Sequence, residues 1–310
     1  MVKNFLINKK TMKAKTSHYN VLNFFIASFY LIFFSWVYFY VPLSLKNSQW
    51  IYFIPFAGIL TYPLWILIHE AIHQTLFSNK TWNDLMGKIL CLYFGAPFRI
   101  VQAGHLLHHG YNRTKEDIND VYNPKEQNKF FAIIKYYYWL ILGLYITEFF
   151  SNLIWLLPQK AFYRLKKYFK SRSSIKYNLI SFLILKLNEV RLEGFVNTIF
   201  YASIFYLYGD KFYVFVLFLL VRGFVISLMD NVFHYGTPAN ILISGYNLKV
   251  PRIFQYILMN GNFHGLHHEK PKIPWYNLEK EFIKLNKQFD GHLLPQIFRQ
   301  FKGPKPANIL

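Results

Sequence analysis

The sequence predicts an all-α integral membrane protein, and three features of its composition and layout support this fold class. Hydrophobic residues make up 54% of the 310 residues and charged residues only 16%, against about 25% charged in an average soluble domain. The apolar residues gather into runs, and about 20 apolar residues in a helix cross a bilayer. The cations behind the net charge of +20 lie in tails and loops beside these runs, which is typical of membrane flanks and not of nucleic-acid binding.

Four apolar runs are expected to form about four transmembrane helices in two hairpins. Residues 21–43 and 51–68 form the first hairpin, with the short link SLKNSQW between them. Residues 194–209 and 212–229 form the second hairpin around two charged residues. Arg222 interrupts the last run, and we expect it to face the protein interior or a polar cavity because a charge at bilayer depth is costly.

The apolar segment 130–157 does not fit this pattern. A single span there would separate the basic loop 159–177 from the histidines at 105–109, although both are expected on the cytosolic side. We therefore expect either an interfacial helix or a re-entrant hairpin bent near Gly143.

The chain is expected to form one domain over residues 1–310, with a basic cytosolic tail at 1–20 and a C-terminal tail at 281–310. No small-residue cleavage site follows the first apolar run, so we expect a retained span and not a signal peptide. The single cysteine, Cys91, excludes an intramolecular disulfide and a cysteine-rich metal site. With the basic N-terminus inside, the segment after residue 69 lies on the cytosolic side.

Nine of the 11 histidines fall into four groups, two of them triples at positions i, i+3 and i+4. Such positions share one side of a helix, so each group can direct two or three imidazoles at one point. Neutral imidazole is the commonest protein ligand for metals, and nine exceed the four ligands of one tetrahedral zinc ion. They suit two metal ions with open positions. The candidate ligands are His69, His73, His105, His108, His109, His234, His264, His267 and His268.

The ligand type alone leaves the metal open among iron, copper, zinc and nickel. The stretch HEAIH matches the H-E-x-x-H motif of zinc proteases, in which Glu70 would be the general base. That motif explains only two of the histidines, so a membrane zinc protease is kept as an alternative. A metal transporter or sensor is the non-enzymatic alternative. A transporter would be expected to carry ligands inside its spans, whereas nearly all of these histidines lie at span ends or between the spans.

The histidine motifs resemble those of the membrane fatty acid desaturase superfamily, which includes hydroxylases and carotenoid ketolases. The family pattern is HxxxH or HxxxxH followed by two HxxHH boxes, and this sequence has HEAIH at 69–73, HLLHH at 105–109 and HGLHH at 264–268. The last box lies in NFHGLHHEKPKIPWYNL, and the resemblance covers most of residues 20 to 280.

The resemblance implies an O₂-dependent oxidoreductase with two non-haem iron ions in a cytosolic, histidine-rich cap. Its expected reaction is desaturation of a fatty acyl or lipid chain, with a lipid, alkane or carotenoid hydroxylase or ketolase as the alternative. The expected partners are the lipid, the membrane (a bacterial inner membrane or an organelle membrane) and a separate electron donor of the ferredoxin or cytochrome type. A separate donor is expected because no haem-binding domain is visible.

Family members often carry a further ligand in an N-x-x-x-H motif. Here the matching stretch is DNVFH, so the resemblance makes His234 an expected ligand. Asp230 stands where the family has asparagine, and its role is left open. Asp230 and Glu70 are candidates for groups that orient the ligands without binding metal.

Asp117 and Glu269 are further candidates for orienting imidazoles, and solvated surface carboxylates are the alternative reading of both. In the loop after the second box, Arg113 and Lys115 are expected either to contact a headgroup or carrier or to lie in solvent.

Overall fold

Helices account for nearly all of the regular structure in the computed structural model, which describes residues 2–307 and the side chains of residues 19–307. Within that part of the chain, four helical segments are apolar and long enough to cross a membrane, which confirms the all-α membrane fold. They are Tyr19–Leu45, Gln49–His73, Lys129–Leu156 and Leu187–Val232. The side chains of the expected basic tail lie outside the described ones, apart from the last two residues.

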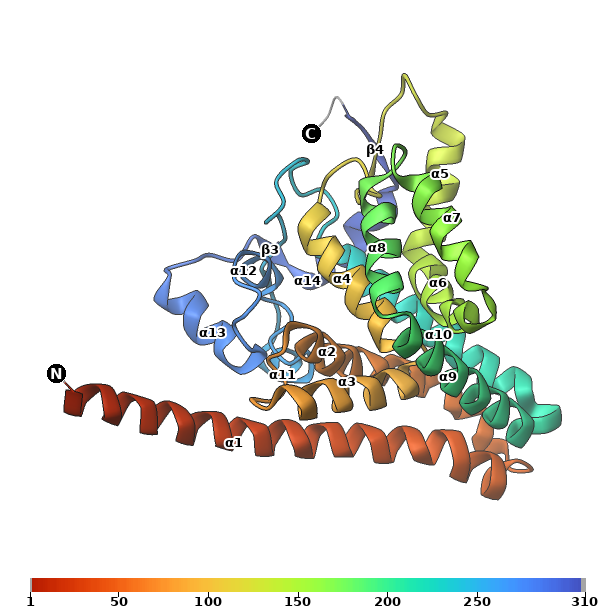
Figure 1. Cartoon of the computed structure of the whole chain (residues 1–310), viewed down its shortest axis with the longest axis horizontal. Helices are drawn as coiled ribbons and strands as arrows, with labels where there is room; N and C mark the ends of the chain where they lie inside the picture. Colours follow the sequence, from red (N-terminus) through yellow and green to blue (C-terminus); the bar gives the residue numbers. More distant parts are fainter. Residues whose placement is uncertain (1, 308–310) are drawn as a thin grey trace.

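The first predicted hairpin is present, and its first arm is the long helix along one side of Figure 1. The chain reverses before Ser48, whose hydroxyl accepts a hydrogen bond from the Trp50 amide and caps the second arm. That arm ends at Gln74, in the left-handed region at φ 59°. The first arm comprises α1 (Val2–Ser35) and η1 (Trp36–Leu45), and the second comprises η2 (Gln49–Leu60) and α2 (Thr61–His73).

The second predicted hairpin consists of α9 (Leu187–Tyr208), η5 (Gly209–Lys211) and α10 (Phe212–Val232). Gly209 has φ 52° at the reversal, a conformation that glycine adopts without a steric penalty. An ion pair of 2.9 Å between Lys46 and Asp210 joins the turns of the two hairpins. Both turns therefore lie at one end of the bundle, and the ends that carry histidines lie at the other.

The segment 130–157 forms a continuous helical run and does not turn back at Gly143. Gly143 has helical angles, φ −58° and ψ −38°, and its carbonyl accepts a hydrogen bond from the Thr147 hydroxyl. A β-carbon at Gly143 would lie 2.6 Å from the Tyr138 ring, so this glycine allows a close approach and not a bend. The structure thus favours an uninterrupted helix over the re-entrant hairpin, and this helix is long and apolar enough to cross a membrane, which the sequence interpretation did not expect. Figure 1 shows it running steeply across the direction of α1. The run comprises α5 (Lys129–Tyr138), η3 (Trp139–Gly143), α6 (Leu144–Phe150) and η4 (Ser151–Leu156).

Arg222 lies fully buried in the bundle, as predicted. Its guanidinium donates to the Thr61 hydroxyl and to the carbonyls of Tyr93 and Phe94, the last two residues of α3 (Lys80–Phe94). The last carbonyls of a helix have no partner inside the helix and carry partial negative charge. Arg222 therefore caps α3 and places its charge where the helix dipole stabilises it.

Helix α4 (Phe98–Tyr111) carries the second histidine box and is held between α3 and the hairpin of α7 (Gln159–Phe169) and α8 (Ser174–Leu185). Arg99, near the start of α4, pairs with Asp84 of α3 and Glu189 of α9. Glu116 accepts hydrogen bonds from the first amides of α8 and so ties the loop after α4 to that helix.

The C-terminal segment after α10 folds back over the histidine-bearing ends of the spans (Figure 1). Two short parallel strand pairs hold it: β1 (Val121–Tyr122) with β4 (Lys305–Pro306), and β2 (Leu248–Lys249) with β3 (Gly291–His292). Its helices are α11 (Arg252–Ile257), α12 (His264–Glu269), α13 (Trp275–Lys284), α14 (Leu293–Arg299) and η6 (Gln300–Lys302).

Candidate metal centre

The nine histidines singled out in the sequence come from four places in the fold. His69 and His73 lie on the last turn of α2, and His234 follows the end of α10. The two triples lie on α4 and α12. The tertiary structure brings all nine together, because α4 and the ends of α2 and α10 meet α12 of the C-terminal segment.

The nine side chains form two groups, and the nitrogen atoms of each group lie within 4.8 Å of one another. The five-histidine group consists of His69, His73, His105, His109 and His267. The four-histidine group consists of His108, His234, His264 and His268.

Each triple is divided between the two groups, which the sequence interpretation did not anticipate. On α4, His105 and His109 join the five-histidine group, whereas His108 joins the other. On α12 the i and i+4 residues join the four-histidine group, and His267, at i+3, joins the five. Consecutive residues point about 100° apart around a helix of 3.6 residues per turn. Positions i and i+4 therefore point the same way, and i+3 points to a different centre.

The Nε2 atoms of the five-histidine group are closely and evenly spaced. His267 Nε2 lies 2.9 Å from His69 Nε2 and 3.0 Å from His109 Nε2. His105 Nε2 lies 3.1 Å from His109 Nε2 and 2.9 Å from His73 Nε2.

The four-histidine group has the same spacing. His264 Nε2 lies 3.0 Å from His268 Nε2 and 2.9 Å from His234 Nε2, and His234 Nε2 lies 3.1 Å from His108 Nε2. A neutral imidazole nitrogen carries either one hydrogen or one lone pair, so a nitrogen with two such neighbours cannot satisfy both by hydrogen bonding.

The spacing instead fits a shared metal ion in each group. Nitrogen atoms bound about 2.1 Å from one metal, at right angles to each other, lie about 3.0 Å apart. The observed separations of neighbouring Nε2 atoms are 2.9–3.1 Å in both groups. Both sets of residues therefore have a donor type and a spacing that can hold a metal ion.

Burial keeps most of these imidazoles in the neutral form. It lowers the pKa of His109 to about 3, with a smaller contribution from His108. It likewise lowers the pKa of His234 and His264 well below the usual value. Since a metal binds the deprotonated nitrogen, a folded pocket that excludes water prepares these side chains for a metal.

His108 differs because a carboxylate contacts its other ring nitrogen. Asp117 Oδ2 lies 2.9 Å from His108 Nδ1. Burial alone would lower the pKa of His108, but Asp117 outweighs burial and raises it. A carboxylate in this position fixes the ring orientation and leaves Nε2 directed at the four-histidine group. Of the carboxylates that the sequence proposed for this task, Asp117 makes the contact.

Glu70 and Glu269 do not hydrogen-bond to a histidine within the described part of the chain. Glu70 accepts hydrogen bonds from the Thr75 hydroxyl and the Trp275 amide, and its nearer oxygen is 3.9 Å from His69 Nδ1. Glu269 instead pairs with Lys287 at 2.7 Å. Glu70 thus fastens the end of α2 to the start of α13, and Glu269 belongs to the surface of α12.

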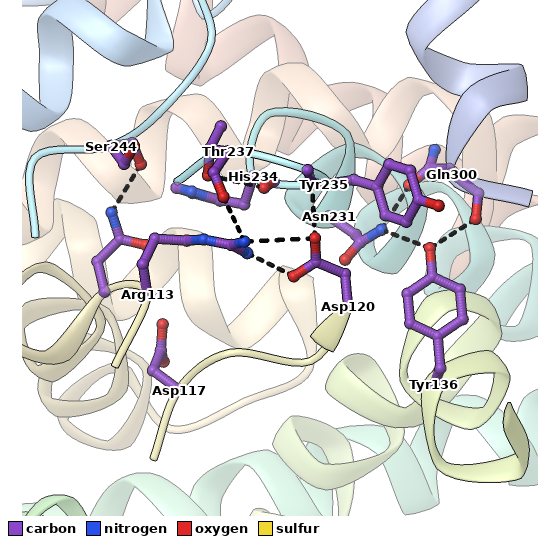
Figure 2. Close-up of polar contacts among 12 residues, drawn as sticks. Arg113, Asp117, Asp120, Tyr136, Asn231, His234, Tyr235, Thr237, Ser244 and Gln300 are labelled. Atoms are coloured by element: carbon purple, nitrogen blue, oxygen red, sulfur yellow. Dashed lines mark hydrogen bonds and ion pairs between the residues drawn. The ribbon is translucent and has the colours of Figure 1, made fainter. Parts of the chain in front are cut away.

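The loop after the second box contains a buried ion pair that the sequence interpretation missed (Figure 2). Arg113 is 2% exposed and Asp120 1%, and their charged groups are 2.5 Å apart. Arg113 also donates to the carbonyl of Thr237, and Asp120 accepts from the Gly236 amide. Both expectations for Arg113, a headgroup contact and a solvated loop, are wrong because its charge holds the turn that follows His234. Lys115 is exposed.

The two residues at the start of DNVFH point in different directions. Asn231 faces away from the histidines, and its amide donates to Gln300 Oε1 and to the Tyr136 hydroxyl (Figure 2). Asp230 lines a cavity beside the histidines and is exposed. No sequence signal separates the two roles, because the partners of Asn231 come from distant helices.

A small cavity lies between α2, α10 and the segment that leads into α13. Histidines of both groups reach it, so a molecule in the cavity lies against the candidate metal centre. Its apolar walls come from Trp65, Ile66, Met229, Phe233, Met259 and Leu278.

The fold and the paired histidine groups define a helical membrane protein with a candidate two-metal centre beside an apolar cavity. Comparison with protein families makes this class specific. The chain belongs to the fatty acid desaturase family, whose model matches residues 48–300.

Individual relatives are distant. The chain is 24% identical to a protein named Sphingolipid delta(4)-desaturase DES1-like from Arabidopsis thaliana, over 74% of this chain and 62% of that protein. It is 24% identical to Sphingolipid delta(4)-desaturase DES1 of Mus musculus over 82% of this chain and 68% of the mouse protein. It is 22% identical to a Fatty acid desaturase of Bacillus subtilis over 72% of this chain and 64% of the bacterial protein. The chain thus spans less than two thirds of the plant and bacterial relatives, and no solved structure matches it.

Proposed function

We propose that this chain is an O₂-dependent di-iron oxidoreductase that introduces a double bond into a lipid chain. The observation that carries the proposal is the spacing of the nine Nε2 atoms in two groups, each suited to one metal ion. Family membership supports iron as the metal, since imidazole by itself also suits copper, zinc and nickel.

In this proposal the five-histidine group and the four-histidine group each hold one iron ion. Bound iron would supply the chemistry that activates O₂ for attack on an unactivated C–H bond, while the protein supplies position and surroundings. Two C–H bonds of the lipid break and one C=C bond forms. O₂ takes up these two hydrogens with two electrons and two protons and leaves as two waters. The electrons come from a separate donor of the ferredoxin or cytochrome type.

The residues of the chain position the lipid and limit access of water. The apolar walls of the cavity suit an alkyl chain, and Asp117 keeps His108 in one orientation. Hydroxylation breaks one C–H bond and inserts oxygen, so the same centre serves a hydroxylase, and the product distinguishes the two. The names of the relatives leave the substrate open between a sphingolipid and a fatty acyl chain.

Nothing in the geometry favours a zinc protease. A catalytic zinc site keeps three protein ligands and an open position, whereas His69 and His73 belong to a group of five histidines. Glu70, the general base of such a site, is engaged by Thr75 and Trp275.

We further propose that the protein is integral to a membrane with the histidines on the cytosolic face. The lysine-rich N-terminal stretch and the basic loop at 159–177 support this orientation. The ion pair between the hairpin turns supports this orientation, because both turns lie at the end of the bundle away from the histidines.

The test is metal analysis together with lipid profiling of a host that expresses the protein. About two irons per chain and new double bonds in the host lipids are expected, and His105→Ala should lose iron and activity while still inserting into the membrane. His292→Ala is the matched control because His292 is exposed and belongs to neither group. One zinc and no iron per chain would overturn the proposal, and hydroxylated products would redirect it to the hydroxylase.

A further inference from the structure

Three consecutive aliphatic side chains form an exposed apolar strip on the loop that follows α10. Ile241, Leu242 and Ile243 are 47%, 44% and 55% exposed. The loop leaves α10 at the end that is followed by His234, so the strip belongs to the histidine-bearing side of the molecule. A run of three exposed apolar residues is unfavourable in water unless it has a function, and such patches mark interaction sites. The strip therefore points to a binding partner.

The loop that carries the apolar strip is closed and held in one conformation. The Tyr246 hydroxyl donates to the Gly236 carbonyl at 3.0 Å and joins the two ends of the loop, as in the compact Ω-loops that frequently carry function. The Asn240 amide donates to the Arg113 carbonyl at 2.9 Å and attaches the loop to the segment after α4. A surface that is already ordered costs a partner less entropy on binding than a mobile one.

One buried side chain links the backbone of the apolar strip to a candidate metal ligand. Asn112 is fully buried, and its amide nitrogen donates to the carbonyls of Leu242 and Ser244 at 2.8 Å each. The same nitrogen lies 3.3 Å from His268 Nδ1, and His268 belongs to the four-histidine group. Electrons tunnel more readily through bonded and hydrogen-bonded atoms than across open space. The path through Asn112 therefore suits electron transfer to this group.

A second contact brings the loop against the four-histidine group directly. A β-carbon at Gly245 would lie 3.3 Å from Gly265 Cα and 3.4 Å from His264 Cδ2. A β-carbon at Gly265 would in turn collide with the Gly245 carbonyl oxygen. The two glycines thus allow the loop to lie on α12 beside the His264 ring. Only the loop itself then separates a protein docked on the strip from this part of the metal centre.

The surroundings of the apolar strip suit an acidic protein. The loop rises between α12 and α4, on the side of the molecule away from α1 (Figure 1). Arg299 and Lys305 lie at its base, where their side-chain nitrogens would be 3.7 and 3.1 Å from a β-carbon at Gly236. Lys115, three residues after Asn112, is exposed. Cations beside an apolar patch attract and orient an acidic partner, and redox partners bind through small interfaces.

We propose that a small acidic electron-transfer protein docks on the apolar strip and passes electrons to the metal centre through this loop. This inference rests on the proposed desaturase function and names the surface that its electron donor contacts. Each donor molecule is oxidised by one electron while docked, and two such transfers supply the two electrons that one desaturation consumes. The two protons come from water.

The test uses two probes, a soluble acidic [2Fe–2S] ferredoxin and the soluble domain of an acidic b-type cytochrome. Their binding to purified iron-loaded protein in lipid nanodiscs is measured by titration, and reduction of the protein's iron by the reduced probe is followed by stopped flow without O₂. Ile243→Glu should weaken binding and slow this reduction about tenfold, because a carboxylate opposes an acidic partner. Iron content and reduction by dithionite, which needs no docking surface, should stay at the wild-type level.

The control is Ile283→Glu, because Ile283 is an isoleucine of α13 that is 65% exposed, and this variant should bind and accept electrons as the wild type does. A wild type that binds neither probe, or an Ile243→Glu variant that binds and is reduced like the wild type, would overturn the inference and leave the desaturase proposal standing. Iron-loaded protein that accepts electrons and desaturates no lipid would count against the desaturase proposal, and the titration would still decide the inference.

A labelled variant separates protein docking from membrane contact and does not depend on Ile243→Glu retaining its fold. The native cysteine, Cys91, is buried, so a fluorophore on Ile243→Cys reports from the strip. Its emission should change when the bound probe is added and should stay unquenched in nanodiscs made with brominated lipid. Quenching by brominated lipid would place the strip in the bilayer, and emission that ignores a bound probe would place docking elsewhere. Either result would overturn the inference.

Discussion

Replacing Asp120 with alanine would leave the buried guanidinium of Arg113 without its counter-ion. Both side chains are at most 2% exposed, and removing one partner of a buried ion pair costs about 3–5 kcal/mol. The Gly236 amide, which donates to Asp120, loses its acceptor as well and adds about 1 kcal/mol. We therefore expect Asp120→Ala to lower the free energy of unfolding by about 4 kcal/mol or more.

The loss should also reach the four-histidine group, because the ion pair holds the turn that follows His234 (Figure 2). The measurements are thermal unfolding of purified protein in detergent and iron content per chain. We expect a lower unfolding temperature and a fall from about two irons towards one, as the four-histidine group loosens and the five-histidine group stays intact.

A double variant and a control make this prediction sharp. Arg113→Met combined with Asp120→Leu removes both charges and should recover most of the lost stability. Asp210→Asn breaks an ion pair that is open to solvent and should change the unfolding temperature little. If Asp120→Ala unfolded at the wild-type temperature with two irons bound, the reasoning from burial would be refuted.

Three other changes have expected outcomes. Arg222→Met should destabilise the protein by about 2–4 kcal/mol, because the end of α3 loses its capping donors. Thermal unfolding measures this loss, and an unchanged unfolding temperature would contradict the capping role. Asp117→Ala should weaken iron binding about 10- to 100-fold in a competition assay with a chelator, since His108 loses the carboxylate that orients it. An iron affinity equal to that of the wild type would show that this contact is dispensable. Gly261→Val should lower turnover at least tenfold with iron content unchanged, because its side chain would fill the space beside Tyr62 and Ile66. Gly291→Val is the control for that variant because a β-carbon at Gly291 meets no atom within 4 Å.

The sequence could predict the spans and the histidines because both signals are local. Runs of apolar residues set the two hairpins, and the structure reproduces them with their turns at the expected links. Helical spacing singled out eight histidines and the DNVFH motif a ninth, His234, and the structure brings these nine together. Two histidines of each triple share a centre and the third belongs to the other centre, because neighbouring positions i+3 and i+4 differ by about 100° around the helix.

The partners of individual charged residues could not be predicted in the same way. Asp117 and Glu269 looked equivalent beside the histidine boxes, yet one orients His108 and the other pairs with Lys287. Arg113 looked like a surface residue of a polar loop, and it is buried against Asp120. The partner of each charged side chain depends on which distant segment of the fold faces it, and the neighbouring sequence does not indicate that segment.

The sequence alone determined that this chain is an α-helical membrane protein with nine clustered imidazoles at the ends of its spans or between them, because hydropathy and helical periodicity act over one or two turns. Only the tertiary structure decided how those imidazoles divide into two groups and which other side chains orient them. It also placed Tyr62 and Asp230 at one cavity, although they are 168 positions apart in the sequence. These features arise where α2, α4, α10 and α12 meet, and contacts between distant helices are fixed by packing and not by any local pattern.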